Sequence, residues 1–379
     1  MKIVLAPDSY KGTLSAAQVC AVMARAVREE LPEAETDAVP MADGGEGTLD
    51  AIVNAANGER IGIAAAGPFG RPFAAEIGIF RRGGERWAVV EAAGLFGLPL
   101  LRLEERNPLH TTSRGLGDAI RAALDLGIRH LVVGLGGSST NDGGMGMLAA
   151  LGAKFADGRG AELTGFGRDL AEMAVADLAG LDPRLAECTL LVASDVANPL
   201  LGPEGATRVY GPQKGADPAT VERLERAMAN YAELLAQASG KRHADAPGAG
   251  AAGGLGAALL TVGARIERGA EVVGLLCGLE ERVRRADVVW TGEGSSDGQT
   301  LYGKLPLHVA GVAREAGKPA YLISGSLGDR WIELLPHFAG CLSTVTRPAA
   351  LEDCLRDAEA NLYATSRNLA RMLASVRGR

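Results

Sequence analysis

Aromatic residues are scarce in this chain, at 4% of its 379 residues. Its interior must therefore be built from Ala, Val, Leu and Ile. The apolar fraction of 47% at this length is enough for two domains with separate cores. No apolar run approaches the roughly 20 residues that a membrane-spanning helix needs. The first apolar stretch stops at Pro7, too early for the core of a signal peptide. We expect a protein without membrane segments.

Cysteine and histidine are few as well, with five residues of each. The cysteines are widely separated and form no CxxC pair, which is typical of free thiols in a reducing cytoplasm. The histidines show no ligand spacing, so a zinc site is not expected. The net charge of −7 argues against a nucleic-acid surface, which needs clustered basic residues. The expected partners are small molecules, and we expect a cytoplasmic monomer or homodimer.

Lysine is rare, because only seven of the 39 basic residues are lysine. Three of these, Lys11, Lys214 and Lys304, each lie beside a glycine in a predicted loop. A chain that otherwise prefers arginine, yet places lysine in these loops, indicates that a compact ammonium group is needed there. The competing interpretation of each one alone is an ordinary solvated lysine.

Strands and helices alternate at both ends of the chain, and this order predicts a parallel sheet whose loops lie on one edge. Between the ends the sequence predicts strands at 61–66, 73–80 and 87–91, the last two joined as a hairpin across Gly83-Gly84. We therefore predict an α/β protein of two domains. Residues 1–59 plus 286–379 form the parallel-sheet domain, and residues 60–285 form an inserted second α/β domain with some antiparallel strands.

Local signals predict several element boundaries. Ser15 and Gln18 form a capping-box signature ahead of a helix that runs to about Leu31. A second helix is expected to end at Asn57-Gly58, a pair typical of helix C-termini. Leucines spaced along 351–373 predict one long final helix.

A glycine-dense loop, residues 134–146, follows the apolar run 131–133 and precedes a short helical stretch. Backbone N–H groups can approach a phosphate where no Cβ intervenes, and the start of a helix adds a favourable partial charge. The loop is therefore a candidate anion cradle. The alternative is a loop that merely needs several residues with positive φ.

Two familiar motifs match only in part. The segment 298–304 fits GxxxxGK, but Leu305 stands where a Walker motif needs Ser or Thr, and the first glycine lies well beyond the strand end. The segment 294–298 fits the GxSxG elbow of α/β-hydrolases with Ser296 as nucleophile. A true elbow lies directly between strand and helix, whereas the next helix is expected only at Pro306. The hydrolase interpretation is kept as an alternative.

Acidic residues follow many of the predicted strands. Because the carboxyl ends of parallel strands meet at one edge of a sheet, these side chains are expected to converge on one crevice. Each one alone is also explained as a helix cap or Asx-turn residue. Acids that hold Mg²⁺, lysines that offset phosphate charge and glycines that admit a polyphosphate together make a phosphoryl-transfer site. The acids are Asp8, Asp43, Glu46, Asp142, Asp195, Glu293 and Asp297.

Six ordered motifs run through the chain. They are Ala6-Pro-Asp-Ser-Tyr-Lys-Gly12, Pro40-Met-Ala-Asp-Gly-Gly-Glu-Gly-Thr48, Gly134-Leu-Gly-Gly-Ser-Ser-Thr-Asn-Asp-Gly-Gly144, Asp195-Val-Ala-Asn-Pro-Leu200, Gly211-Pro-Gln-Lys-Gly-Ala216 and Thr291-Gly-Glu-Gly294 with Asp297, Gln299-Thr300 and Gly303-Lys304. In these motifs the chain resembles the class I glycerate kinases, over essentially its whole length. The resemblance implies ATP-dependent phosphorylation of D-glycerate with Mg²⁺, and 2-phospho-D-glycerate is the expected product. It also implies that the split domain is flavodoxin-like, a Rossmann-like three-layer fold.

Four residues are candidates for the catalytic step. Asp195 is the first candidate to orient or deprotonate the attacking hydroxyl, and Asp8 is the second, because one carboxylate must lie near the nucleophile. Lys11 or Lys214 either anchors the carboxylate of glycerate or neutralises the phosphoryl group in transfer.

The remaining candidates bind metal, ATP or substrate. Magnesium normally takes one or two protein carboxylates, so Asp43 with Glu46, or Glu293 with Asp297, is expected to hold it. ATP is expected to contact Gly136, Gly137, Ser138, Ser139, Asn141, Asp142 and Lys304, and the substrate is expected to contact Asp43, Gly44, Gly45, Asn198 and Gln213.

Two other functions stay open. One is the serine hydrolase above, and the other is a nucleotide-binding module without catalysis. Because aromatic residues are so few, the adenine base is expected to lie between aliphatic side chains.

Overall fold

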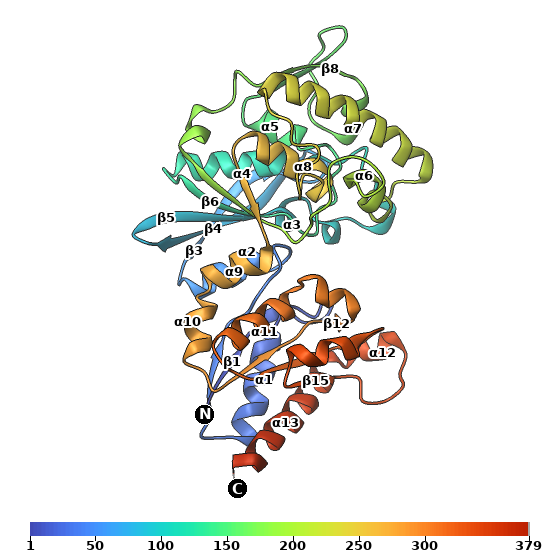
Figure 1. Ribbon diagram of the computed structural model, residues 1–379. Helices are drawn as coiled ribbons and strands as arrows, with labels where there is room; N and C mark the ends of the chain where they lie inside the picture. Colours follow the sequence, from blue (N-terminus) through green and yellow to red (C-terminus); the bar gives the residue numbers. More distant parts are fainter. Residues whose placement is uncertain (378–379) are drawn as a thin grey trace. The chain divides into compact units, whose positions relative to one another are not determined.

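The computed structural model describes residues 1–377. Its chain divides into two compact units, Met1–Asp43 with Ala270–Arg379 as unit 1 and Gly44–Gly269 as unit 2 (Figure 1). The predicted domains were 1–59 plus 286–379 and 60–285. This prediction places both changes of domain later in the chain than the structure does. Helix α2 (Thr48–Ala55) therefore lies in unit 2 and helix α10 (Leu279–Arg284) in unit 1. The predicted domain limits themselves stay a prediction.

Unit 1 is built on five parallel strands in the order β15-β13-β11-β1-β2. Helices α1 (Ala16–Glu30) and α13 (Ala358–Arg377) pack side by side on one face of this sheet, over Leu5 and Trp290 (Figure 1). Helix α11 (Leu305–Glu315) packs on β11 and β13 through buried residues outside that cluster. This is the expected flavodoxin-like arrangement. The strands are β1 (Lys2–Leu5), β2 (Glu35–Ala38), β11 (Val288–Thr291), β13 (Ala320–Ser324) and β15 (Gly340–Ser343).

Two local predictions in unit 1 meet different outcomes. The capping box of α1 is confirmed, because the Gln18 amide donates to Ser15 Oγ at 3.3 Å and the Ser15 amide donates to Gln18 Oε1 at 2.8 Å. The single final helix is wrong. The chain forms α12 (Leu351–Arg356) and then α13, with a break at Asp357. The leucine spacing crosses this break, so Leu351 lies exposed although Leu362 and Leu369 of α13 are buried.

Unit 2 contains a mixed sheet of six strands in the order β10-β9-β6-β5-β4-β3. Strands β3 to β5 pair antiparallel, whereas β5, β6, β9 and β10 pair parallel. The predicted hairpin is confirmed, since Gly83 and Gly84 make its turn with φ of 60° and 86°. The strands are β3 (Glu59–Ala66), β4 (Pro72–Arg82), β5 (Glu85–Glu91), β6 (His130–Gly134), β9 (Thr189–Ala193) and β10 (Arg265–Glu267).

The core of unit 2 is made largely of aliphatic side chains, as the scarcity of aromatics required. A further hairpin of β7 (Lys154–Asp157) and β8 (Met173–Asp177) was not predicted. The helices of unit 2 are α2, α3 (Ala92–Phe96), α4 (Arg114–Asp125), α5 (Met145–Ala150), α6 (Ala206–Tyr210), α7 (Pro218–Ser239) and α8 (Ala251–Thr261).

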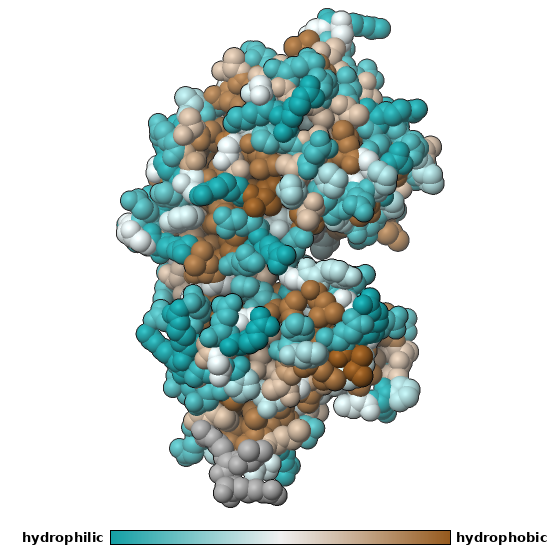
Figure 2. Space-filling view, in the orientation of Figure 1, coloured by the Kyte–Doolittle hydropathy of each residue, from teal (hydrophilic) through white to brown (hydrophobic). Residues whose placement is uncertain are grey.

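Apolar side chains on the surface are scattered among hydrophilic ones on the face drawn in Figure 2. Among the residues that the structure describes, no helix combines the length and the apolar character needed to cross a membrane.

Candidate active site

The carboxyl edge of the unit 1 sheet has a topological switch point between β1 and β11. Strand β1 continues through α1 to β2 on one side, and β11 continues through α11 to β13 on the other. The loops after β1 and β11 therefore diverge, and ligands of such sheets bind in the crevice that this divergence leaves. Asp8 follows β1 and Glu293 follows β11, so both acids lie at this switch point.

Asp8 belongs to a charged group with Lys11 and Asp43. The Nζ atom of Lys11 lies 3.1 Å from Asp43 Oδ2, and Asp43 raises the pKa of Lys11. Asp8 is only 6% exposed, and its Oδ1 accepts one hydrogen bond, from the Ser9 amide at 2.7 Å. Burial, together with the charge of Asp43, raises the pKa of Asp8 to about 7 although Lys11 opposes this shift. The carboxyl group of Asp8 is thus able to exchange a proton near neutral pH.

Glu293 is buried and held by two hydroxyl groups. Ser296 Oγ and Thr300 Oγ1 donate to its Oε1 at 2.8 and 2.9 Å, and Ser296 Oγ also shares a hydrogen bond with Ser324 Oγ at 2.7 Å. Burial raises the pKa of Glu293, whereas Lys304 and the two hydroxyls lower it. Because both hydroxyls bind Oε1, the second oxygen, Oε2, is left facing the Nζ of Lys304 at 4.0 Å.

Ser296 therefore does not have the setting of a hydrolase nucleophile. It lies in the extended segment β12 (Ser295–Ser296), which pairs with β14 (Ser326–Leu327), rather than on a strand-to-helix elbow. Its side chain is fully buried, and among the described residues its hydroxyl is bonded to Glu293 and Ser324 and to no histidine.

Asp297 caps the short 3₁₀ helix 298–302, since its Oδ1 accepts from the Gln299 amide at 2.8 Å. The same oxygen lies 3.9 Å from Lys304 Nζ, so this lysine is placed between Asp297 and Glu293. Across the described residues no three metal-ligating side chains converge. A site of one or two carboxylates is still the kind that Mg²⁺ uses, because it keeps several waters and binds substrate phosphates. The oxygens of Glu293 and Asp297 fit such a site.

The glycine-dense loop of unit 2 is mostly buried and is tied to its surroundings by Asp142. The carboxylate of Asp142 accepts from the amide and hydroxyl of Ser113, at 2.7 and 2.8 Å, and from the amides of Gly144 and Gly146, at 3.1 and 3.3 Å. Ser139 Oγ donates to the carbonyl of Phe96 at 2.7 Å. These two predicted ATP contacts have their hydrogen-bonding capacity largely used by the protein itself.

Lys214 gives the same loop a buried cation. Its side chain is 2% exposed, and its Nζ donates to the Thr140 carbonyl at 2.7 Å and to Ser138 Oγ at 3.4 Å. Burial lowers its pKa to about 7, although the charge of Asp142 opposes this. The neighbouring Gly137 is exposed, with φ of 74°, and the amides of Gly137 and Ser138 have no protein acceptor among the described residues. Two amides, a hydroxyl and an ammonium group are the donors of an anion site.

The remaining predicted residues of unit 2 have individual settings. Asp195 is exposed and its Oδ1 accepts from the Gly269 amide at 2.8 Å, while Gln213 is exposed. Asn198 bridges the Tyr210 hydroxyl, at 2.8 Å, and the Glu204 carbonyl, at 2.7 Å.

Several loop residues hold their backbones close together. A Cβ on Gly44 would lie 2.4 Å from the Ala193 carbonyl oxygen, and one on Gly136 would lie 2.5 Å from Gly45 Cα. Asn141 donates to Thr207 Oγ1 at 3.1 Å, whereas its own Oδ1 is buried and receives no donor from the described part of the chain.

The predicted metal ligands do not lie in one unit. Glu46 is exposed just before α2 in unit 2, whereas Glu293 and Asp297 belong to unit 1. Sequence reasoning also missed Glu91, a buried acid at the end of β5 that accepts from the Leu49 amide at 3.1 Å. Burial raises the pKa of Glu91 to about 7. Its position as the last residue of a predicted strand was the available signal, and the same signal was used for the other acids.

Comparison with known proteins agrees with this geometry. The profile of the glycerate kinase family matches residues 3–374. The chain is 44% identical to the glycerate 2-kinase of Escherichia coli strain K12, over 99% of this chain and 98% of that protein. It is 42% identical to the glycerate kinase of Bacillus subtilis strain 168, over 98% and 97%. A crystal structure from Salmonella typhimurium LT2, assigned as a glycerate kinase 2, superposes with a TM-score of 0.86 at 43% identity and covers 100% of both chains. This chain therefore belongs to the glycerate kinase family.

Proposed function

We propose that this chain transfers the γ-phosphoryl group of ATP to D-glycerate, forming 2-phospho-D-glycerate, with Mg²⁺ as the metal. The observation that carries the proposal is the group of Asp8, Lys11, Glu293 and Lys304 at the switch point of unit 1. Phosphoryl transfer needs carboxylates for the metal and the attacking hydroxyl, and it needs ammonium groups for phosphate charge. The names of the relatives add the identity of the acceptor.

Asp8 is our candidate for the general base. A base works best when its pKa is near the operating pH, and the pKa of Asp8 is raised to about 7. Asp195, the first candidate from the sequence, is supported less, because it is exposed and one of its oxygens already accepts from Gly269. Lys11, exposed beside Asp8, would anchor the carboxylate of glycerate.

Three sets of groups would offset the negative charge of the ATP phosphates. Lys214, with the amides of Gly137 and Ser138, would bind phosphate oxygens in unit 2. Lys304 would do so in unit 1. Glu293 and Asp297 would hold Mg²⁺, which when bound lowers the negative charge of the phosphates.

The five cysteines are all free thiols. This supports the proposal that the enzyme works in the reducing cytoplasm. We further propose that it is a monomer or homodimer.

The test is a coupled assay of ADP release with a panel of short hydroxy acids, followed by ³¹P NMR of the product against authentic 2- and 3-phosphoglycerate. We expect turnover with D-glycerate and the 2-phosphate signal. Binding of ATP without ADP release would indicate a non-catalytic module, and labelling of Ser296 by a fluorophosphonate would indicate the hydrolase.

The base is tested by Asp8→Asn, which is expected to lower kcat by roughly 10²–10⁴. The matched control is Asp329→Asn, an exposed aspartate of the same unit, which should keep full activity. A folded Asp8→Asn protein that loses less than about tenfold would rule out Asp8 as the base.

A further inference from the structure

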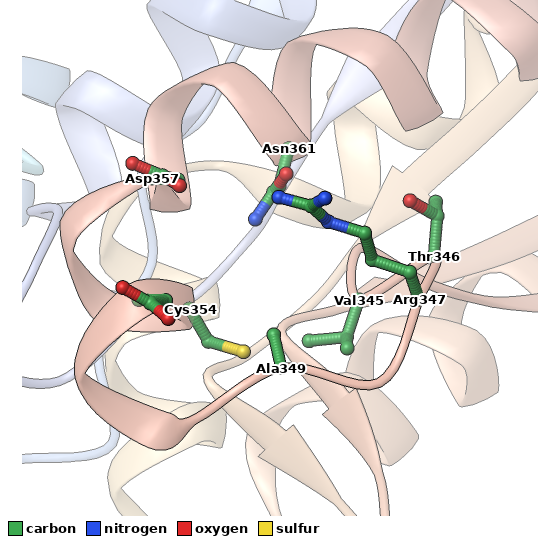
Figure 3. Close-up of a pocket in the computed structure, with 8 residues that line it drawn as sticks. Val345, Thr346, Arg347, Ala349, Cys354, Asp357 and Asn361 are labelled. Atoms are coloured by element: carbon green, nitrogen blue, oxygen red, sulfur yellow. The ribbon is translucent and has the colours of Figure 1, made fainter.

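A hollow lies beyond the end of β15, on the carboxyl edge of the unit 1 sheet. Residues 345–349 form one wall, and α12 with the first turn of α13 forms the other (Figure 3). The hollow is partly open to solvent. The lining residues are Val345, Thr346, Arg347, Ala349, Asp353, Cys354, Asp357 and Asn361.

The hollow is joined to the Glu293 site through a single residue. Gly325 donates its amide to the carbonyl of Glu293 at 3.0 Å, and its own carbonyl accepts from Thr344 Oγ1 at 3.1 Å. Thr344 directly precedes the first wall of the hollow. The hollow and the Glu293 site are thus connected by hydrogen bonds at the same edge of the unit 1 sheet.

Three polar side chains of the hollow are uncommitted. Within the described part of the chain, the side chains of Thr346, Arg347 and Asn361 make no hydrogen bond or ion pair. Figure 3 shows the guanidinium of Arg347 reaching across the hollow toward the side of Asn361. The carboxylates are different, because Arg356 binds Asp353 at 2.7 Å and Asp357 at 3.1 Å.

The composition of the lining restricts the ligand. Two carboxylates and one guanidinium disfavour an anion, and the uncommitted polar groups disfavour a purely apolar ligand. A flat heteroaromatic base fits better, because an Asn side chain can pair with the donor and acceptor edge of adenine and a guanidinium stacks on ring faces. Val345, Ala349 and Cys354 supply apolar walls for such a ring.

We propose that this hollow binds the adenine base of ATP, with Asn361 pairing with the edge of the base and Arg347 covering its face. This rests on the proposed function, since it assigns the base of the nucleotide that the reaction uses. It differs in part from the expectation of aliphatic contacts alone, because one face of the ring is covered by arginine.

Cys354 gives a direct probe that does not depend on catalysis. This thiol is half-buried in the wall of the hollow, and the half-buried Cys188 and Cys341 serve as references in the same protein. Alkylation by iodoacetamide is followed at each thiol by peptide mass spectrometry. Adenosine at ten times its half-protecting concentration should slow alkylation of Cys354 about tenfold and leave the references unchanged. Inorganic tripolyphosphate should not protect Cys354.

Variants test the same site through ATP. Asn361→Ala should raise the KM for ATP roughly three- to tenfold or more, from one or two lost hydrogen bonds, with kcat and the KM for glycerate unchanged. Arg347→Ala should act in the same direction. The matched control, Asn368→Ala, removes an exposed asparagine of the same helix and should change nothing.

Two results would overturn the assignment. One is protection of Cys354 by tripolyphosphate but not by adenosine, which would make the hollow an anion site. The other is an unchanged KM for ATP in Asn361→Ala. Failure of the glycerate kinase activity itself would appear instead as absent ADP release, while adenosine protection could still be read.

Discussion

Replacing Thr300 by valine tests whether hydroxyl groups position Glu293 for catalysis. Thr300 is fully buried, and valine has nearly its shape but lacks the hydroxyl that donates to Glu293 Oε1 at 2.9 Å and accepts from the Asp297 amide at 3.2 Å. A hydrogen bond to a charged group is worth about 1.5–3 kcal/mol. If the reaction requires ionised Glu293 in this orientation, kcat/KM at neutral pH should fall roughly tenfold to hundredfold.

The pH profile separates positioning from simple loss of structure. The Thr300 hydroxyl lowers the pKa of Glu293 against the effect of burial. Its removal should therefore move the acid limb of kcat/KM to higher pH and increase the Mg²⁺ concentration needed for half-maximal rate. Thr300→Ser retains the hydroxyl and should restore both.

The control is Thr365→Val in α13. Thr365 is also a buried threonine of unit 1, but its Oγ1 has no hydrogen-bond partner among residues 1–377. This variant should keep the wild-type profile. A folded Thr300→Val protein that stays within about twofold of wild type with an unmoved acid limb would show that these hydroxyls do not position Glu293, because even one ordinary hydrogen bond is worth more than that.

Two further predictions concern protonation. Activity should follow a narrow bell centred near pH 7. It should rise as Asp8 and Glu293 lose their protons and fall as Lys214 loses its own, since the pKa values of Asp8 and Lys214 are moved to about 7 and that of Glu293 is raised. A kcat/KM profile that is flat from pH 6 to 8 would contradict this. Lys214→Met should increase the free energy of unfolding more at pH 6 than at pH 9, by about 2–3 kcal/mol in urea titrations. The sign follows because the folded pKa of about 7 lies below the ordinary 10.5, so the unfolded wild type binds more protons between these values and wild-type stability rises with pH. An equal gain at both pH values would refute it.

Much of the fold was predictable from local signals because those signals act locally. Ser15 and Gln18 satisfy amides within one helical turn, and Gly83-Gly84 supply the positive φ that the hairpin turn needs. The break at Asp357 carries no proline or glycine, so the leucine pattern ran through it. The two-residue strands β12 and β14 are too short to show any periodicity, although they place Ser296 against Glu293.

The family and the general region of the site were also predictable from the sequence. Which acids bind ligand and which only stabilise the structure was not. A sequence shows that an acid follows a strand, but it does not show how many donors the folded chain directs at that acid. Asp142 receives four donors and has little capacity left for a ligand. Glu293 receives two, both on one oxygen, and Asp8 receives one.

The number of protein donors that each carboxylate receives ranks these acids by how easily they can bind a ligand. A buried carboxylate with all its lone pairs filled by backbone amides is a structural cross-link, because a ligand would have to displace bonds that hold two segments together. A buried carboxylate with an open oxygen can still accept from a cation or a proton donor of a ligand. Asp8 and Glu293 are in that second state, each with a lysine nearby, and they follow neighbouring strands whose connecting loops diverge at the switch point. The four donors to Asp142 give this residue a structural role, although it lies in the glycine-dense loop.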